Sequence, residues 1–259
     1  MDSSEITSDD VKAANRLLYD AIATRYEEID GRRSPELETW ICSRLRKIRD
    51  QVPGGLLLDL GTGSGLVMRC GGDVFDSCIG IDLSPKILVA NNPGRSCVAG
   101  DIDDLPFADN SFDVITCFAV LHHLFDFKAL VAEVARVIRP GGAFYTDHDM
   151  DKGFSSVFSP FLRLYRKIKN TRTDYVNIHP RITDEIYDLS ERHEDGINTP
   201  YLISLLDSAG FSVEVNYHWF GLSPFFNRLF KQKRYPRRLA PIVSLVAVKG
   251  QEQKATQKN

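Results

Sequence analysis

Aspartates close three short apolar runs in the first half of the sequence, namely Asp59, Asp82 and Asp101. Short apolar runs that end at a turn are typical of buried parallel strands. Open α/β sheets bind their ligands at the carboxyl ends of such strands, where a carboxylate can accept the hydroxyl groups of a ribose. Helix capping would explain any one of these acids, but it explains the set poorly. The spacing therefore predicts one ligand-binding edge that contains all three.

A glycine-rich turn follows the first of these acids, with Gly61, Gly63 and Gly65 at alternate positions. Glycine is needed where the backbone takes a positive φ or where a ligand approaches too closely for a Cβ atom. A dinucleotide-binding G-x-G-x-x-G turn would continue with glycine where Leu66 stands, and no P-loop lysine motif is present. The turn therefore favours a ligand without phosphate, with a nicotinamide dehydrogenase as the alternative enzyme.

Histidines are expected at the same edge. His122 and His123 follow an apolar run at 112–118, and His148 follows another at 142–146. Imidazole titrates near neutral pH, so each of the three is a candidate general base or a group that orients a substrate. The alternative for the adjacent pair is structural, with one histidine capping the following helix and the other packing.

The segment 147–151 also resembles a set of metal ligands, because it places three aspartates around His148. The end of the run at 112–118 adds no further acid to this set, because the sequence has Phe118 and Ala119 there. We therefore expect no metal.

The elements that must position these side chains alternate between helical and strand patterns, which predicts an α/β fold with a parallel sheet. The first helix has Ser8 or Asp9 as its expected N-cap, and the turn at 139–142 should end a helix and release a strand. The expected helices are 9–29, 35–48, 129–138, 159–169 and one from 198–200 to 209, and the expected strands are 56–58, 78–81, 98–102, 112–118, 142–146, 211–219 and 242–248.

We expect one domain over the 259 residues. Its predicted parts are a helical cap at 1–50, a cofactor-binding core at 51–150, a lid insertion at 151–197, a completion of the core at 198–249 and a flexible tail at 250–259.

Charge divides unevenly along this chain. The formal net charge is −3, but residues 1–150 hold −9 and residues 151–259 hold +6. The start is polar and acidic, no apolar run reaches membrane-spanning length, and the five cysteines include no C-x-x-C pair. We therefore expect a cytoplasmic protein without a disulfide framework.

Two stretches of the basic half, 158–169 and 225–238, interleave aromatic and aliphatic residues with cations. Such surfaces can contact an anionic membrane or receive a lipid-like acceptor. The alternative is that the apolar residues pack on the sheet while the cations face water. Nucleic acid, a further partner that basic surfaces can bind, is not expected here.

The motifs together resemble the class I S-adenosylmethionine-dependent methyltransferases, in the small-molecule branch that includes ubiquinone, menaquinone and natural-product enzymes. The resemblance rests on the segments 57–65, 80–85, 100–107, 111–115, 121–124 and 139–142. It implies a Rossmann-like, seven-stranded, mostly parallel sheet sandwiched by helices, with an N-terminal helical cap and an inserted lid.

The resemblance also implies roles for individual residues around S-adenosylmethionine. Asp59 with the backbone of Gly61 and Gly63 would hold the methionine portion, Asp82 the ribose hydroxyls, Leu83 an adenine face, and Asp101 with the Ile102 amide the adenine edge, while Phe118 would line the methyl group. Tyr19 and Tyr26 would close over the methionine end, and the alternative for both is ordinary helix packing. The implied activity is methyl transfer to oxygen or carbon, less readily nitrogen, of a small hydrophobic or lipid-linked acceptor. The alternative outside enzymes is a cofactor-binding scaffold or regulatory protein without turnover. The oligomeric state is left open.

Overall fold

The computed structural model describes residues 6–30, 34–169 and 171–251, and the side chains of residues 30, 164–169, 171 and 174 lie outside that description. The tail predicted to be flexible therefore falls mostly outside the described residues. Within them, no helix is both long and apolar enough to cross a membrane.

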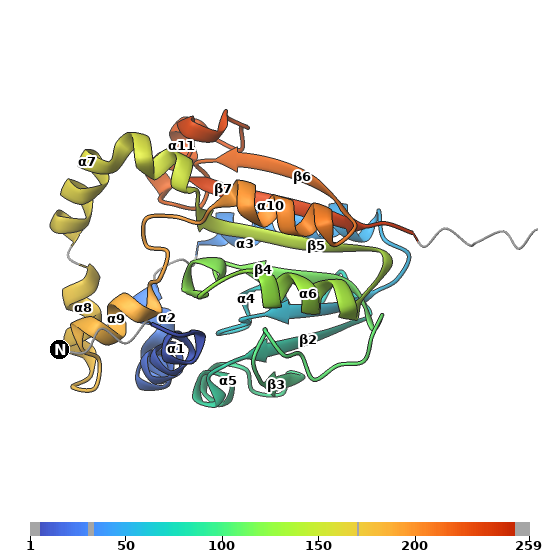
Figure 1. Ribbon diagram of the computed structural model, residues 1–259, viewed down its shortest axis with the longest axis horizontal. Helices are drawn as coiled ribbons and strands as arrows, with labels where there is room; N and C mark the ends of the chain where they lie inside the picture. Colours follow the sequence, from blue (N-terminus) through green and yellow to red (C-terminus); the bar gives the residue numbers. More distant parts are fainter. Residues whose placement is uncertain (1–5, 31–33, 170, 252–259) are drawn as a thin grey trace, which may run out of the picture.

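A seven-stranded sheet forms the centre of the molecule, in the order β3-β2-β1-β4-β5-β7-β6 (Figure 1). The pairs from β3 to β5 are parallel, and β7 runs antiparallel to both of its neighbours. This confirms the predicted Rossmann-like, mostly parallel α/β class. The strands are β1 (Leu56–Leu60), β2 (Ser77–Asp82), β3 (Cys97–Ala99), β4 (Phe112–Phe118), β5 (Ile138–Met150), β6 (Phe211–His218) and β7 (Ile242–Lys249).

Helices cover both faces of this sheet. On one face α6 (Lys128–Val137) and α10 (Thr199–Ser208) bury Leu130, Val134, Leu202 and Leu206 against the strands. On the other face α3 (Pro35–Arg49) and α4 (Leu66–Gly71) pack on the sheet, with Trp40 among the buried side chains. The apolar periodicity of each helix produces this two-sided core.

The N-terminal cap differs from the single helix predicted at 9–29. Helix α1 (Ser8–Ile22) is followed by a 3-10 turn, η1 (Ala23–Arg25), and by a short helix α2 (Tyr26–Asp30). Its N-cap is Thr7 rather than Ser8 or Asp9, because Thr7 and Asp10 exchange side-chain and backbone hydrogen bonds in a capping box. The second predicted helix is confirmed, with Ser34 as its cap and Pro35 in its first turn.

The inserted segment is more helical than its sequence pattern predicts. Helix α7 (Lys152–Lys169) begins seven residues before the predicted 159, and it bends at Phe158 two residues before Pro160. Helices α8 (Thr171–Ile178) and α9 (Asp184–Ser190) follow. Helix α9 packs on α1 around Leu18 and Ile22, so the insertion and the cap meet at one end of the sheet (Figure 1).

The turn predicted at 139–142 lies inside β5, which begins at Ile138 directly after α6. Gly141 has a φ of 80°, which explains the glycine, and the pairing with β4 shifts register here. The remaining elements are α5 (Pro85–Asn91), α11 (Pro224–Phe230) and the 3-10 turns η2 (Leu121–His123) and η3 (Arg237–Leu239).

Candidate active site

The glycine-rich turn after β1 has the backbone geometry that its sequence indicates. Gly61, Gly63 and Gly65 have φ values of 62°, 52° and 74°. A Cβ atom on Gly61 would approach Val120 Cγ2 to 2.5 Å. The amide of Gly63 donates to Asp82 Oδ2 at 2.9 Å, so the turn is fixed to the end of β2.

Two buried carboxylates lie behind this turn. Asp59 is 2% exposed and accepts a hydrogen bond of 2.8 Å from the Thr116 hydroxyl. Burial raises the pKa of Asp59 to about 7, against the hydrogen bonds, and the nearby charge of Asp82 adds to the effect. Burial also raises the pKa of Asp82. Among the described residues neither forms an ion pair with lysine or arginine, so both favour a ligand with cationic or hydroxyl groups.

Two neighbouring cavities open at this edge of the sheet, with volumes of about 110 Å³ and 60 Å³. They share several walls, so they form one elongated site. The shared residues are Tyr19, Tyr26, Gly61, Phe118, Ala119 and His123.

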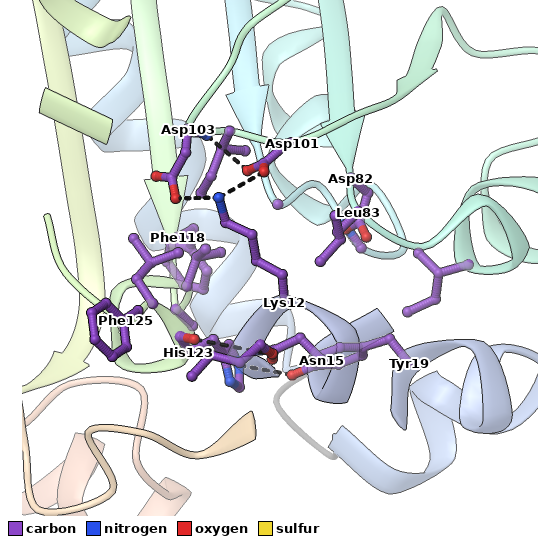
Figure 2. Close-up of a pocket in the computed structure, with 18 of the residues that line it drawn as sticks. Lys12, Asn15, Tyr19, Asp82, Leu83, Asp101, Asp103, Phe118, His123 and Phe125 are labelled. Carbon is purple, nitrogen blue, oxygen red and sulfur yellow. Dashed lines mark hydrogen bonds and ion pairs between the residues drawn. The ribbon is translucent and has the colours of Figure 1, made fainter. Parts of the chain in front are cut away.

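Every predicted cofactor-binding residue lines one of these cavities. The larger contains Gly63, Asp82, Leu83, Asp101 and Ile102, the smaller contains Asp59, and both contain Gly61, Phe118 and Tyr26. Figure 2 shows Asp82, Leu83, Asp101 and Phe118 in the larger cavity. The individual contacts to a cofactor remain predictions, but the structure brings the residues together as expected.

Helix α1 contributes residues that the sequence reasoning missed. Lys12 Nζ lies 2.7 Å from Asp101 Oδ2 and 2.8 Å from Asp103 Oδ2, across the wall of the larger cavity (Figure 2). Asn15 donates to the carbonyl oxygen of His123 at 3.1 Å. A polar residue such as Asn15 on the apolar face of a predicted helix is the signal that could have indicated this wall. Asp101 itself follows β3 by two residues instead of closing it.

The three candidate histidines have different hydrogen-bond partners and different positions relative to the cavities. His123 Nε2 lies 2.7 Å from the Tyr19 hydroxyl, and its Nδ1 lies 2.8 Å from the carbonyl oxygen of Ser190. Because a carbonyl only accepts, Nδ1 carries the proton and Nε2 accepts from tyrosine. Burial and the neighbouring His122 lower the pKa of His123 to about 4. A neutral ring with both nitrogens bonded suits a positioning role better than proton transfer.

His122 lines the smaller cavity and has a different environment. Its Nδ1 lies 2.6 Å from Oδ1 of Asp149, which is 1% exposed, and the same oxygen accepts from the His122 amide. The carboxylate therefore fixes the proton on Nδ1 and leaves Nε2 as the basic nitrogen. Glu191, from the end of the insertion, lies 3.7 Å from that Nε2.

His148 lines neither cavity, so its prediction as a base has no support from this geometry. Its Nδ1 bonds Asp147 at 2.9 Å, and its ring stacks on Phe118 at 4.4 Å between centroids. His218 and the Trp40 indole donate to the same Asp147 carboxylate, at 2.9 and 3.0 Å. Burial opposes ionisation of Asp147, but the two imidazoles outweigh it and hold its pKa well below the usual range.

The segment 147–151 does not form one ligand set. Asp147 serves the buried network, Asp149 pairs with His122, and Asp151 accepts from Thr199 and Arg237 at 2.5 and 2.9 Å. Two other groups bring potential ligand atoms within 4.8 Å of one another, namely His122 with His123 and Glu191, and Asp147 with His148 and His218. The expectation of no metal remains a prediction.

The two basic stretches are only partly free. In the second, Arg237 bonds the buried Asp151, Arg234 pairs with Glu214 at 2.8 Å, and aromatic residues pack on Trp219. Phe225 and Leu229 remain 67% and 59% exposed on α11. In the first stretch, the side chains of 164–169 lie outside the described residues.

Comparisons with known proteins agree with this geometry. Residues 58–146 match a family model described as a methyltransferase domain. The chain is 30% identical over 149 residues to a demethylmenaquinone methyltransferase of Corynebacterium urealyticum, covering 56% of this chain and 65% of the relative. It is 29% identical over 130 residues to a human protein described as a probable tRNA methyltransferase 9B, covering 48% of this chain and 26% of the relative. The matched part thus spans less than two thirds of these relatives.

Solved structures show the same fold at low sequence identity. The YcgJ protein of Bacillus subtilis aligns with a TM-score of 0.55 at 16% identity, over 82% of this chain and 99% of that one. The [4+2]-cyclase SpnF aligns with a TM-score of 0.59 at 15% identity, over 93% and 97%. Residues 58–146 therefore match a methyltransferase domain, and the chain has the fold of solved S-adenosylmethionine-dependent methyltransferases.

Proposed function

We propose that this chain transfers the methyl group of S-adenosylmethionine to an oxygen or carbon atom of a small, hydrophobic acceptor. The observation that carries the proposal is the pair of joined cavities, because Phe118 and His123 line both and His122 lines the smaller one. A cofactor that reaches from the larger cavity to Asp59 in the smaller one would place its methyl group beside these three side chains, and the acceptor would approach from the side of His122.

The residues present fit the cofactor. The glycine backbone with positive φ leaves room at Gly61 and Gly63. The carboxyl groups of Asp59 and Asp82, which have no lysine or arginine partner among the described residues, suit an ammonium group and a ribose. When bound, S-adenosylmethionine supplies an electrophilic methyl group on a sulfonium. The protein's main contribution is then alignment of the acceptor, which can be worth roughly 7–11 kcal/mol.

His122 is the favoured base among the three histidines. Asp149 holds its proton on Nδ1, so Nε2 can take a proton from an acceptor hydroxyl or acidic C–H in the smaller cavity. His123, held neutral between Tyr19 and Ser190, would orient the acceptor.

An apolar, lipid-like acceptor is supported by two observations. The name of the bacterial relatives, demethylmenaquinone methyltransferase, refers to a prenylated ring as their substrate. The exposed Phe225 and Leu229 of α11, beside Arg228 and Lys231, offer a surface for contact with an anionic membrane. The cations bonded to Asp151 and Glu214 contribute less to such contact than their sequence suggested.

The activity is tested by incubating the chain with methyl-labelled S-adenosylmethionine and a short-chain demethylmenaquinone, with total tRNA as a second acceptor. We expect label in the quinone, lost at least about 100-fold in His122→Ala and Asp149→Asn and retained in the surface control Asp207→Asn. Label in tRNA alone would overturn the acceptor class. Cofactor binding without label in either acceptor or in cell extract would favour the scaffold alternative.

Membrane contact is tested by flotation with vesicles containing phosphatidylglycerol. We expect association at low salt that falls when Phe225 and Leu229 become serine, while Arg46→Gln on α3 leaves it unchanged. Equal flotation of both variants would contradict the role of α11.

A further inference from the structure

A third hollow of about 400 Å³ lies on the face of α1 turned away from the cofactor cavities. Lys12, Asn15 and Tyr19 of α1 face the cavities, whereas Arg16, Asp20 and their apolar neighbours face this groove. The volume falls in the range of small-molecule sites, roughly 300–1,000 Å³. Its lining residues are Ala13, Arg16, Leu17, Asp20, Ala21, Lys86, His179 and Arg181.

Three separate segments build the groove. Helix α1 provides its floor, α5 provides Lys86, and the loop between α8 and α9 provides His179 and Arg181. Figure 1 shows α1 with α9 on one side and α5 on the other, and the contacts between these helices agree. The groove thus joins the cap, the cofactor-binding core and the insertion.

The charges in the groove are not balanced by the protein. Arg16, Lys86 and Arg181 are exposed, and within the described residues none of them forms an ion pair with an acid. The acid present, Asp20, accepts a 2.6 Å hydrogen bond from the Ser84 hydroxyl and offsets one of the three charges. Like charges gathered in one hollow repel one another unless an anion lies between them.

The imidazole of His179 adds a directed donor. Its Nδ1 accepts a hydrogen bond of 3.1 Å from the Arg181 amide, so the ring proton of the neutral form lies on Nε2. Two guanidinium groups, an ammonium and an imidazole N–H are the donor set that binds phosphate oxygens well, because arginine offers two parallel hydrogen bonds.

We propose that this groove binds a phosphate-bearing anion, at a site distinct from the methyl-transfer site. The apolar floor of Ala13, Leu17 and Ala21 follows the helical spacing i, i+4, i+8 and gives the non-phosphate part of such a ligand a surface to contact. The phosphate group belongs either to a free diphosphate or to the headgroup of an anionic phospholipid. The first binds from solution, and the second must be offered in a vesicle.

The test uses the full chain and two probes. Inorganic pyrophosphate is titrated by calorimetry at low salt, and vesicles with and without phosphatidic acid are tested by flotation. The variant is Arg16→Gln with Arg181→Gln, and the matched control is Arg46→Gln with Lys47→Gln, which removes the same charge from the exposed side of α3.

We expect one of the two probes to bind the native chain, at least about tenfold more weakly in the groove variant and unchanged in the control. Circular dichroism and thermal unfolding must show the groove variant to be folded. Absence of binding by both probes up to 10 mM phosphate, or equal loss in the groove variant and the control, would overturn the proposal.

Discussion

Asp59 gives the site a predictable dependence on pH. Burial raises the pKa of its carboxyl to about 7, so the group is largely ionised above pH 7 and largely protonated below it. A cationic ligand needs the ionised form, and an α-amino group stays mostly protonated below about 7.7–8.0. We expect the affinity for S-adenosylhomocysteine to fall roughly tenfold or more between pH 7.5 and 5.5, as measured by calorimetry.

Asp59→Asn should remove that pH dependence and bind weakly throughout. The same variant should unfold less readily at pH 8, because a carboxyl whose folded pKa exceeds its unfolded pKa loses stability as pH rises between the two values. With one pKa unit equal to about 1.4 kcal/mol, the expected gain is of order 1–4 kcal/mol in urea unfolding. An unchanged pH profile in the variant would refute contact between Asp59 and the cation.

Asp82 is expected to hold the ribose, and its replacement tests that role. Asp82→Ala should weaken S-adenosylhomocysteine binding about 10–100-fold, because charge-assisted hydrogen bonds are worth roughly 1.5–3 kcal/mol each. The exposed Asp104→Ala, in the neighbouring loop, serves as the control and should bind normally. Because Asp82 also fixes Gly63 and Ser84, Asp82→Asn separates loss of charge from collapse of the turn.

The acids were predictable from sequence and their partners on α1 were not. Asp59 and Asp82 lie at strand ends, and strand ends follow from local apolar runs. The ion pair of Lys12 with Asp101 joins residues 89 positions apart, through the packing of a helix whose docking no local pattern encodes. The different roles of His122 and His123 likewise depend on their partners Asp149 and Ser190, which belong to other elements.

A buried polar contact attaches helix α3 to the sheet within an apolar interface. Trp40 is 2% exposed and donates from its indole nitrogen to Asp147, while its ring stacks on Phe220. Trp40→Phe keeps much of the packing and removes this donor from a buried carboxylate. We expect a loss of about 1–3 kcal/mol in the free energy of unfolding, measured with urea.

Trp219→Phe is the matched control for that change, because the Trp219 indole donates to Leu239 at a more exposed position. Its cost should stay below about 1 kcal/mol. Equal losses in the two variants would mean that the buried network around Asp147 contributes no more than a surface hydrogen bond.

Element boundaries were predicted best where capping chemistry is local. Pro35 lies in the first turn of α3, at the predicted start of that helix, and Asn198 caps α10 within the predicted 198–200. The break of the first helix at 23–25 and the early start of α7 have no such signal, since their sequences remain compatible with helix. The cap packs against the insertion at the first of these boundaries, and at the start of α7 the Gly153 amide donates to Asp151.

At the scale of the whole molecule, the acidic first half and the basic second half of the chain contribute to different sites. The acids of the first half include those at the cofactor cavities, and the basic second half supplies Arg181 to the groove and Arg228 to α11. Helix α1 lies between the cavities and the groove and contributes side chains to both. Anything that fixes α1 against α5 and α9 therefore also fixes one wall of the cofactor cavity.

This arrangement predicts coupling between the two sites. Pyrophosphate at saturation should tighten S-adenosylhomocysteine binding about threefold to thirtyfold, because each ligand holds α1 in the position that the other requires. By linkage, S-adenosylhomocysteine must tighten pyrophosphate binding by the same factor, so two calorimetric titrations check each other. Arg16→Gln with Arg181→Gln should abolish the enhancement and leave the basal affinity for S-adenosylhomocysteine unchanged. Independent binding of the two ligands would contradict this coupling. It would show that α1 is already held rigidly in place, so that binding in the groove does not change the affinity of the cavities.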